Sequence, residues 1–155
     1  MKTLFPYKGF DDIPFKMSYE AVCKTLRKNN VKFTTEHWPN KGCSPEVAWD
    51  IIRVGEDVSF FFAKGKMFKI YVENGFSGCL ENGVSMGMTI AEAQSIDPSI
   101  QYDDWEEEYT SNLGYWLEDD VESHEIISIT VFIKELEDEE VFFRYEWCED
   151  EENES

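Results

Sequence analysis

The sequence predicts an α+β protein made of two tandem similar units, each with a helix packed on an antiparallel β-sheet. Three observations lead to this prediction. Residues 13–22 are similar to residues 84–93, which lie 71 positions later in the chain. In each copy a short apolar alternation leads through Met to a Ser or Thr, and then to the opening of a helix. Segments with the two-residue apolar alternation of β-strands follow each copy.

The two helices are predicted from their capping residues. Ser18 and Thr89 are natural N-caps, and Thr89 with Glu92 has the spacing of a capping box. We expect the first helix to span residues 19–29 and to end at a pair of asparagines. The second helix is expected over residues 90–95, because an Asp-Pro pair follows it and proline disfavours a helical residue before it.

The strands are predicted from apolar runs between turn residues. In the first unit we expect a strand at residues 32–37 and a hairpin of residues 58–62 and 67–72, with a glycine in its turn. Residues 39–51 form an additional stretch of this unit. In the second unit we expect strands at residues 114–117, 126–133 and 141–147, with Trp116 facing inward. We expect one compact domain of two half-repeats, about 1–80 and 81–148, followed by an acidic disordered tail at 149–155.

Composition indicates a folded protein without a metal or cofactor. Hydrophobic residues make up 42% and aromatic residues 15% of the 155 residues, which suffices for a core and argues against intrinsic disorder. No apolar run is long enough to span a bilayer, and the N-terminus lacks the features of a signal peptide, so we expect a cytoplasmic protein. The cysteines are widely spaced, without a C-x-x-C pair, and are expected to be reduced thiols: Cys23, Cys43, Cys79 and Cys148. With only His37 and His124 in addition, no metal site is expected.

The negative charge lies in the last third of the chain. Residues 1–100 contain twelve Lys or Arg and twelve Asp or Glu, whereas residues 101–155 contain twenty-one acids and two bases, so they account for the whole formal charge of −19. Such a surface repels nucleic acid and anionic membranes and attracts a basic protein. No calcium-binding loop of the EF-hand pattern is present.

The acidic clusters are the candidate binding surface, because aromatic residues lie among them and can act as anchors in an interface. Solvated loops that aid solubility are the alternative explanation, which we favour for residues 149–155. The predicted partner-binding residues are Asp103, Asp104, Trp105, Glu106, Glu107, Glu108 and Tyr109, then Glu118, Asp119 and Asp120, and then Glu137, Asp138, Glu139 and Glu140.

Two short motifs resemble known sequences. Residues 6–18, PYKGFDDIPFKMS, resemble the "PYKG…I-x-FGMS" opening of many small bacterial proteins, and residues 83–89, GVSMGMT, resemble its "GI-x-IGMT" form. The chain departs from this pattern at Lys16, where a glycine is usual, and in its short second helix. The duplicated layout is similar to tandem-repeat inhibitors of the beta-lactamase inhibitory protein type and to immunity proteins of contact-dependent growth inhibition systems. The resemblance covers about twenty residues, and its motifs are folding signals without chemistry of their own.

The sequence shows no catalytic motif: G-x-S-x-G, a phosphate-binding loop and H-E-x-x-H are all missing. We therefore expect a protein that is not an enzyme. The first hypothesis is an immunity protein that neutralises a bacterial toxin, a basic nuclease, by covering it with the acidic surface. An acidic adaptor for a basic protein unrelated to toxins is the second hypothesis, and an enzyme of unrecognised class is the third.

Overall fold

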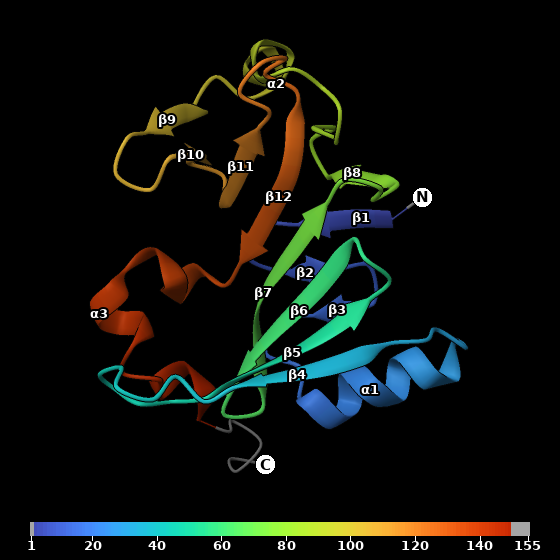
Figure 1. The fold of residues 1–155 in the computed structure, drawn as a ribbon, viewed down its shortest axis with the longest axis vertical. Helices are drawn as coiled ribbons and strands as arrows, with labels where there is room; N and C mark the ends of the chain where they lie inside the picture. Colours follow the sequence, from blue (N-terminus) through green and yellow to red (C-terminus); the bar gives the residue numbers. More distant parts are fainter. Residues whose placement is uncertain (1, 150–155) are drawn as a thin grey trace.

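A large antiparallel sheet forms the centre of the computed structural model, which describes residues 2–149 (Figure 1). Its eight strands lie in the order β4-β5-β6-β7-β12-β11-β10-β9. They are β4 (Thr34–Trp38), β5 (Trp49–Val54), β6 (Val58–Ala63), β7 (Lys66–Glu73), β9 (Gln101–Asp103), β10 (Glu108–Ser111), β11 (Tyr115–Asp119) and β12 (Ile126–Phe132). Strands β4 to β7 follow one another as antiparallel neighbours, and so do β9 to β12. Antiparallel pairing of β7 with β12 joins these two meanders into one sheet.

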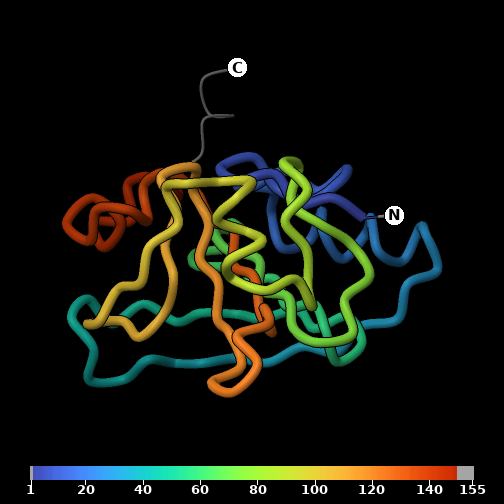
Figure 2. Tube along the Cα trace, turned by 90° about the horizontal axis from the view of Figure 1, so that it is seen from above, coloured from blue at the N-terminus to red at the C-terminus, as the bar shows by residue number. Residues whose placement is uncertain are grey.

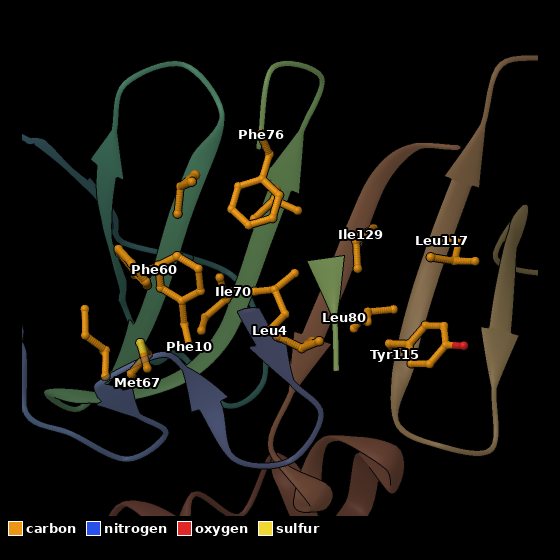
Figure 3. Packing of buried hydrophobic residues seen from close by; sticks show 14 of the residues in the cluster. Leu4, Phe10, Phe60, Met67, Ile70, Phe76, Leu80, Tyr115, Leu117 and Ile129 are labelled. Carbon is orange, nitrogen blue, oxygen red and sulfur yellow. The ribbon is translucent and has the colours of Figure 1, made fainter. Parts of the chain in front are cut away.

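A second, four-stranded sheet has the order β3-β2-β1-β8. It consists of β1 (Lys2–Phe5), β2 (Gly9–Phe10), β3 (Ile13–Pro14) and β8 (Gly78–Leu80). The pairing of β1 with β8 is parallel and brings together segments that lie more than seventy residues apart. Figure 3 shows Leu4 and Phe10 of this sheet packed with Phe60 and Ile70 of the large sheet.

The two predicted helices are present, and their caps are as expected. Helix α1 spans Tyr19–Lys28, and Ser18 Oγ accepts a hydrogen bond of 3.1 Å from Ala21 N. Helix α2 spans Ile90–Ile96 and begins with a complete capping box between Thr89 and Glu92. Together with the sheets, they confirm the α+β class.

The main core lies between one face of the large sheet and a layer formed by the small sheet, α1 and α2. Val22 and Leu26 of α1 and Ile90 of α2 are buried in the same cluster as Ile129 at the centre of the large sheet. Apolar positions in these helices recur three or four residues apart, so one face of each helix can be removed from water. Removing this apolar surface from water is the main force that holds the two layers together.

The opposite face of the large sheet is covered in part by the C-terminal segment, which lies away from α1 in both views (Figure 1, Figure 2). The segment consists of η1 (Lys134–Glu137), α3 (Glu139–Phe142) and η2 (Glu146–Cys148). Phe142 is fully buried, with its ring centroid 5.0 Å from that of Phe68 in β7.

The strand predicted at residues 141–147 is therefore wrong. Strand β12 has β7 on one side and β11 on the other, so neither edge is free to pair with a following strand. Asp138 Oδ1 instead accepts a 3.0 Å hydrogen bond from Glu140 N and caps α3, and Tyr145 takes a left-handed backbone conformation with φ of 57°. The aromatic residues of this segment pack against a face of the large sheet and do not form a strand of it.

The sequence analysis did not predict strands β5, β9 and β10 of the large sheet, of which β5 falls at the end of the additional stretch and just after it. It also did not predict the four strands of the small sheet. The strand predicted at 32–37 is β4, which begins two residues later. Trp116 does not face the main core: Tyr115 and Leu117 do, and Trp116 lies on the opposite face with its ring against Phe132. Most of the predicted acidic tail, residues 150–155, lies outside the described residues.

Candidate partner-binding surface

The hairpin of β9 and β10 presents the most exposed aromatic side chain of the described chain. Asp103 Oδ1 accepts hydrogen bonds from Trp105 N at 2.9 Å and from Glu106 N at 3.2 Å, which fixes the turn. Trp105 lies within this turn with 89% of its surface exposed. The loop geometry thus holds a large apolar ring in water, where it has no packing role within residues 2–149.

Within residues 2–149, the carboxylates of this hairpin form no ion pair with a basic side chain. Ion pairs within residues 2–149 join other groups, and none includes Asp103, Asp104, Glu106, Glu107 or Glu108. Unpaired like charges on one hairpin repel each other and create a negative potential around Trp105. Of the three predicted clusters, this one has the arrangement most suited to a basic partner.

A cleft of about 570 Å³ lies between this hairpin and the C-terminal segment, on the face of the large sheet opposite α1 and α2. Strands β10, β11, β12 and β7 contribute its floor, and η1 and α3 contribute the far wall. Figure 1 shows the β9–β10 connection and α3 on the same side of the sheet. The aromatic residues that line it are Trp49, Phe68, Trp116, Phe132 and Phe143. The carboxylates that line it are Asp103, Glu106, Glu108, Glu137 and Glu139.

Among the described residues, Lys69 is the one basic residue that lines the cleft, and it lies among aromatic rings. Its Nζ is 4.4 Å from the ring centroid of Phe61 and 5.5 Å from that of Trp49, as in a cation–π contact. Burial lowers the pKa of Lys69, and the charge of Glu108 partly opposes this effect. Within residues 2–149 its ammonium group forms no ion pair.

Glu108 is the most perturbed carboxylate of the cleft. Its pKa is raised to about 7, mainly by burial and also by the charges of Glu118, Glu106 and Asp103, while the charge of Lys69 acts in the opposite direction. A carboxylate with this pKa exchanges its proton near neutrality. Groups with strongly shifted pKa values in a cleft are candidates for a functional role.

The second predicted cluster is divided among structural contacts. Glu118 Oε1 accepts hydrogen bonds from Tyr71 OH at 3.2 Å and from Ser128 Oγ at 2.5 Å. Asp119 Oδ2 lies 2.9 Å from His124 Nδ1. Asp120 Oδ1 accepts two backbone N–H groups of the β11–β12 turn, which lower the pKa of this carboxyl. None of the three lines the cleft.

The third predicted cluster is likewise mixed. Tyr7 OH donates a 2.5 Å hydrogen bond to Glu137, which also pairs with Lys134 Nζ at 2.9 Å. Asp138 caps α3, as described above. Glu139 and Glu140 are exposed, and Glu139 lines the cleft.

The alternation of side chains along the strands decides which predicted residues meet. Tyr109 packs against the main core, whereas its neighbour Glu108 faces the cleft. Sequence analysis missed Lys69 and assigned Trp116 to the core. A signal for Lys69 was present, because a single charged residue interrupts the apolar run of β7, a central strand.

Comparisons with known proteins found no match: no family model, no curated protein and no solved structure is similar to this chain. Among residues 2–149, no helix has both the length and the apolar character needed to cross a bilayer. Within the same range, no cluster of three or more His, Cys, Asp or Glu side chains is arranged to hold a metal ion.

Proposed function

We propose that this chain is an immunity protein, which binds a basic toxin, a nuclease, and covers the groove with which the toxin binds nucleic acid. One observation carries the proposal: Trp105 is 89% exposed on a hairpin whose carboxylates have no basic partner within residues 2–149. Tryptophan is enriched among the residues that contribute most of the binding energy of protein interfaces, and complementary charges around such a residue speed association. Carboxylates take the place of phosphates on the basic surface of a nuclease, and the same charge keeps the inhibitor off nucleic acid.

The test is affinity capture from the native cell with two baits, the unmodified chain and the variant W105A/D104K/E107K. All three side chains are exposed, so the variant is expected to fold. A basic nuclease that the first bait retains and the second loses, and that a stoichiometric amount of the chain inhibits, supports the proposal. If both baits retain the same basic proteins, the hairpin is not the binding surface and the proposal is wrong.

Salt dependence gives a second measurement on the captured complex. Steering by unpaired carboxylates predicts an association rate that falls roughly tenfold between about 20 and about 150 mM salt, while the dissociation rate changes much less. A captured partner without toxic or nuclease activity would instead favour an adaptor role. An association rate indifferent to salt would contradict the steering argument.

We also propose that the two halves of the chain are tandem copies of one unit, a helix followed by a four-stranded meander. Two backbone hydrogen bonds support it: their donors are 71 residues apart, as in the sequence, and their acceptors are 59 residues apart. Lys16 N donates to Met67 O, and Gly87 N donates to Ile126 O. Lys16 and Gly87 both have positive φ, 71° and 85°, which agrees with a glycine being usual at this point.

A second pair of contacts has the same two offsets, 71 residues for the donors and 59 for the acceptors. Tyr19 N donates to Gly65 O, and Ile90 N donates to His124 O, so each helix begins on the hairpin of the last two strands of its meander. An experimental structure tests this proposal by superposition of α1, β6 and β7 on α2, β11 and β12. A best fit that does not pair residue 19 with residue 90 would contradict the duplication. In this arrangement the second copy carries the acidic hairpin.

A further inference from the structure

The cleft beside the hairpin contains more negative charge than its own residues neutralise. Five carboxylates line it against one lysine, which leaves a formal charge of −4 when all are ionised. Lys69 compensates this charge only in part, because it acts on Glu108 without forming an ion pair, and its ammonium group lies over the rings of Phe61 and Trp49. An open site with this charge favours a cationic occupant.

We propose that this cleft binds the side chain of an arginine that projects from the partner protein. This inference rests on the proposed function and specifies how the partner is held. The guanidinium group would stack on Trp116 and donate hydrogen bonds to Glu106 and Glu108. Trp105, at the tip of the adjoining hairpin, would pack on the surface around that arginine.

The aromatic floor favours a planar cation. Trp116 is half-buried, lines the cleft and packs on Phe132, with ring centroids 4.3 Å apart and an interplanar angle of 33°. Guanidinium groups stack on indole rings and donate two parallel hydrogen bonds to carboxylates. An ammonium group is a compact and strongly hydrated charge, and the lysine of the chain itself already occupies the neighbouring rings.

The carboxylates differ in their freedom to accept such a ligand. Glu137 is held by Tyr7 and Lys134, so it forms part of the wall. Glu106 and Glu108 have no side-chain hydrogen bond or ion pair within residues 2–149, and Glu108 is partly buried. Burial of Glu108 is unfavourable in the free protein, because only the charge of Lys69 opposes its own, and a bound cation would reduce that cost.

The volume of the cleft is also suitable for an arginine side chain. About 570 Å³ lies within the range of ligand pockets and exceeds the volume of one side chain, so waters can remain beside the guanidinium group. An arginine in a partly desolvated pocket, with aromatic contacts around it, is a frequent hot spot of interfaces.

The test uses the full chain, labelled with ¹⁵N, and N-acetyl-arginine methylamide as the probe. We expect saturable shifts of the Trp116 indole resonance, assigned with the variant W116F, at a dissociation constant on the order of 1–10 mM. The citrulline analogue has the same shape without the charge and is expected to bind at least roughly tenfold more weakly. The variant E106Q/E108Q is expected to weaken arginine binding at least roughly fivefold.

The matched control is E122Q/E125Q, which removes the same charge from exposed positions of the β11–β12 turn. It should leave the Trp116 titration unchanged, because these residues do not line the cleft. Equal binding of citrulline and arginine, or equal effects of the two double variants, would overturn the proposal.

Failure of this inference is distinguishable from failure of the proposed function. If the captured partner needs Trp105 but binds E106Q/E108Q as well as the unmodified chain, the cleft proposal is wrong and the function stands. If arginine binds at Trp116 but no basic protein is captured, the cleft stands and the proposed function is wrong.

Discussion

Replacing Glu108 with glutamine is expected to stabilise the free protein above neutral pH and to have little effect in mild acid. Burial raises the pKa of Glu108 from 4.5 to about 7, with further contributions from Glu118, Glu106 and Asp103 and an opposing one from Lys69. The folded chain therefore holds a proton that the unfolded chain releases between these two values. Stability falls as the pH rises through this window, and the loss is complete above pH 7.

The size of the effect follows from the shift. At about 1.4 kcal/mol for each pKa unit, a rise from 4.5 to about 7 corresponds to at most about 3–4 kcal/mol. Because the side chain is only partly buried and the solvent screens its neighbours, we expect about 1–2 kcal/mol. Glutamine keeps the shape and removes the charge, so E108Q should recover this amount at high pH.

Urea unfolding at two pH values measures the difference. E108Q should gain about 1–2 kcal/mol at about pH 8.5 and only a few tenths at about pH 4, where the carboxyl is mostly protonated in the folded and in the unfolded chain. The control is E107Q, which removes the same charge from the neighbouring exposed residue and should show no such change with pH. A gain for E108Q that is equal at both pH values would refute this reasoning.

Three further substitutions test the contacts around the site by urea unfolding. D97A should lower the free energy of unfolding by about 2–4 kcal/mol, because the buried Asp97 accepts hydrogen bonds from Tyr115 OH and other groups, which would lose their partner. A decrease below about 1 kcal/mol would contradict this. F142A should lower the free energy of unfolding by about 3–5 kcal/mol and loosen the packing of the C-terminal segment on the sheet. Near-ultraviolet circular dichroism would detect the loosened packing, and an unchanged spectrum would contradict it. G114A should lower the free energy of unfolding by about 2 kcal/mol or more, because residue 114 has a φ of +99° and its new Cβ would lie 2.4 Å from the Tyr7 ring. A variant as stable as the unmodified chain would show that the ring moves freely.

Features that depend on neighbouring residues were predicted well from the sequence. The first turn of each helix is fixed by its cap, so Ser18 and Thr89 located α1 and α2 correctly. The hairpin of β6 and β7 was also correct, because its turn and its alternation are both local.

Features that depend on pairing across the chain were not predictable in the same way. The run at 141–147 has the composition of a strand, but no edge beside β12 is open to it. Strands β9 and β10 are short and polar, and only their neighbours in the sheet make them strands.

The candidate site also has one part that could be predicted from the sequence and one part that could not. Sequence analysis identified the acidic residues around Trp105, because charge can be counted directly. It did not identify Lys69 or place Trp116 in the cleft, because both follow from which face of the sheet each position occupies. A shift of one residue in register would move either side chain to the other face.

The pairing of β7 with β12 has a consequence for how the chain folds. Each meander can form from contacts between nearby residues, but the seam joins residues 69–73 to residues 128–132, so it closes a loop of about sixty residues. Formation of the seam is therefore expected to limit the folding rate. Until it forms, β7 is an open edge strand in the middle of the future sheet, and two chains can pair there instead. A fragment that ends near residue 80 should expose that edge permanently and associate with itself.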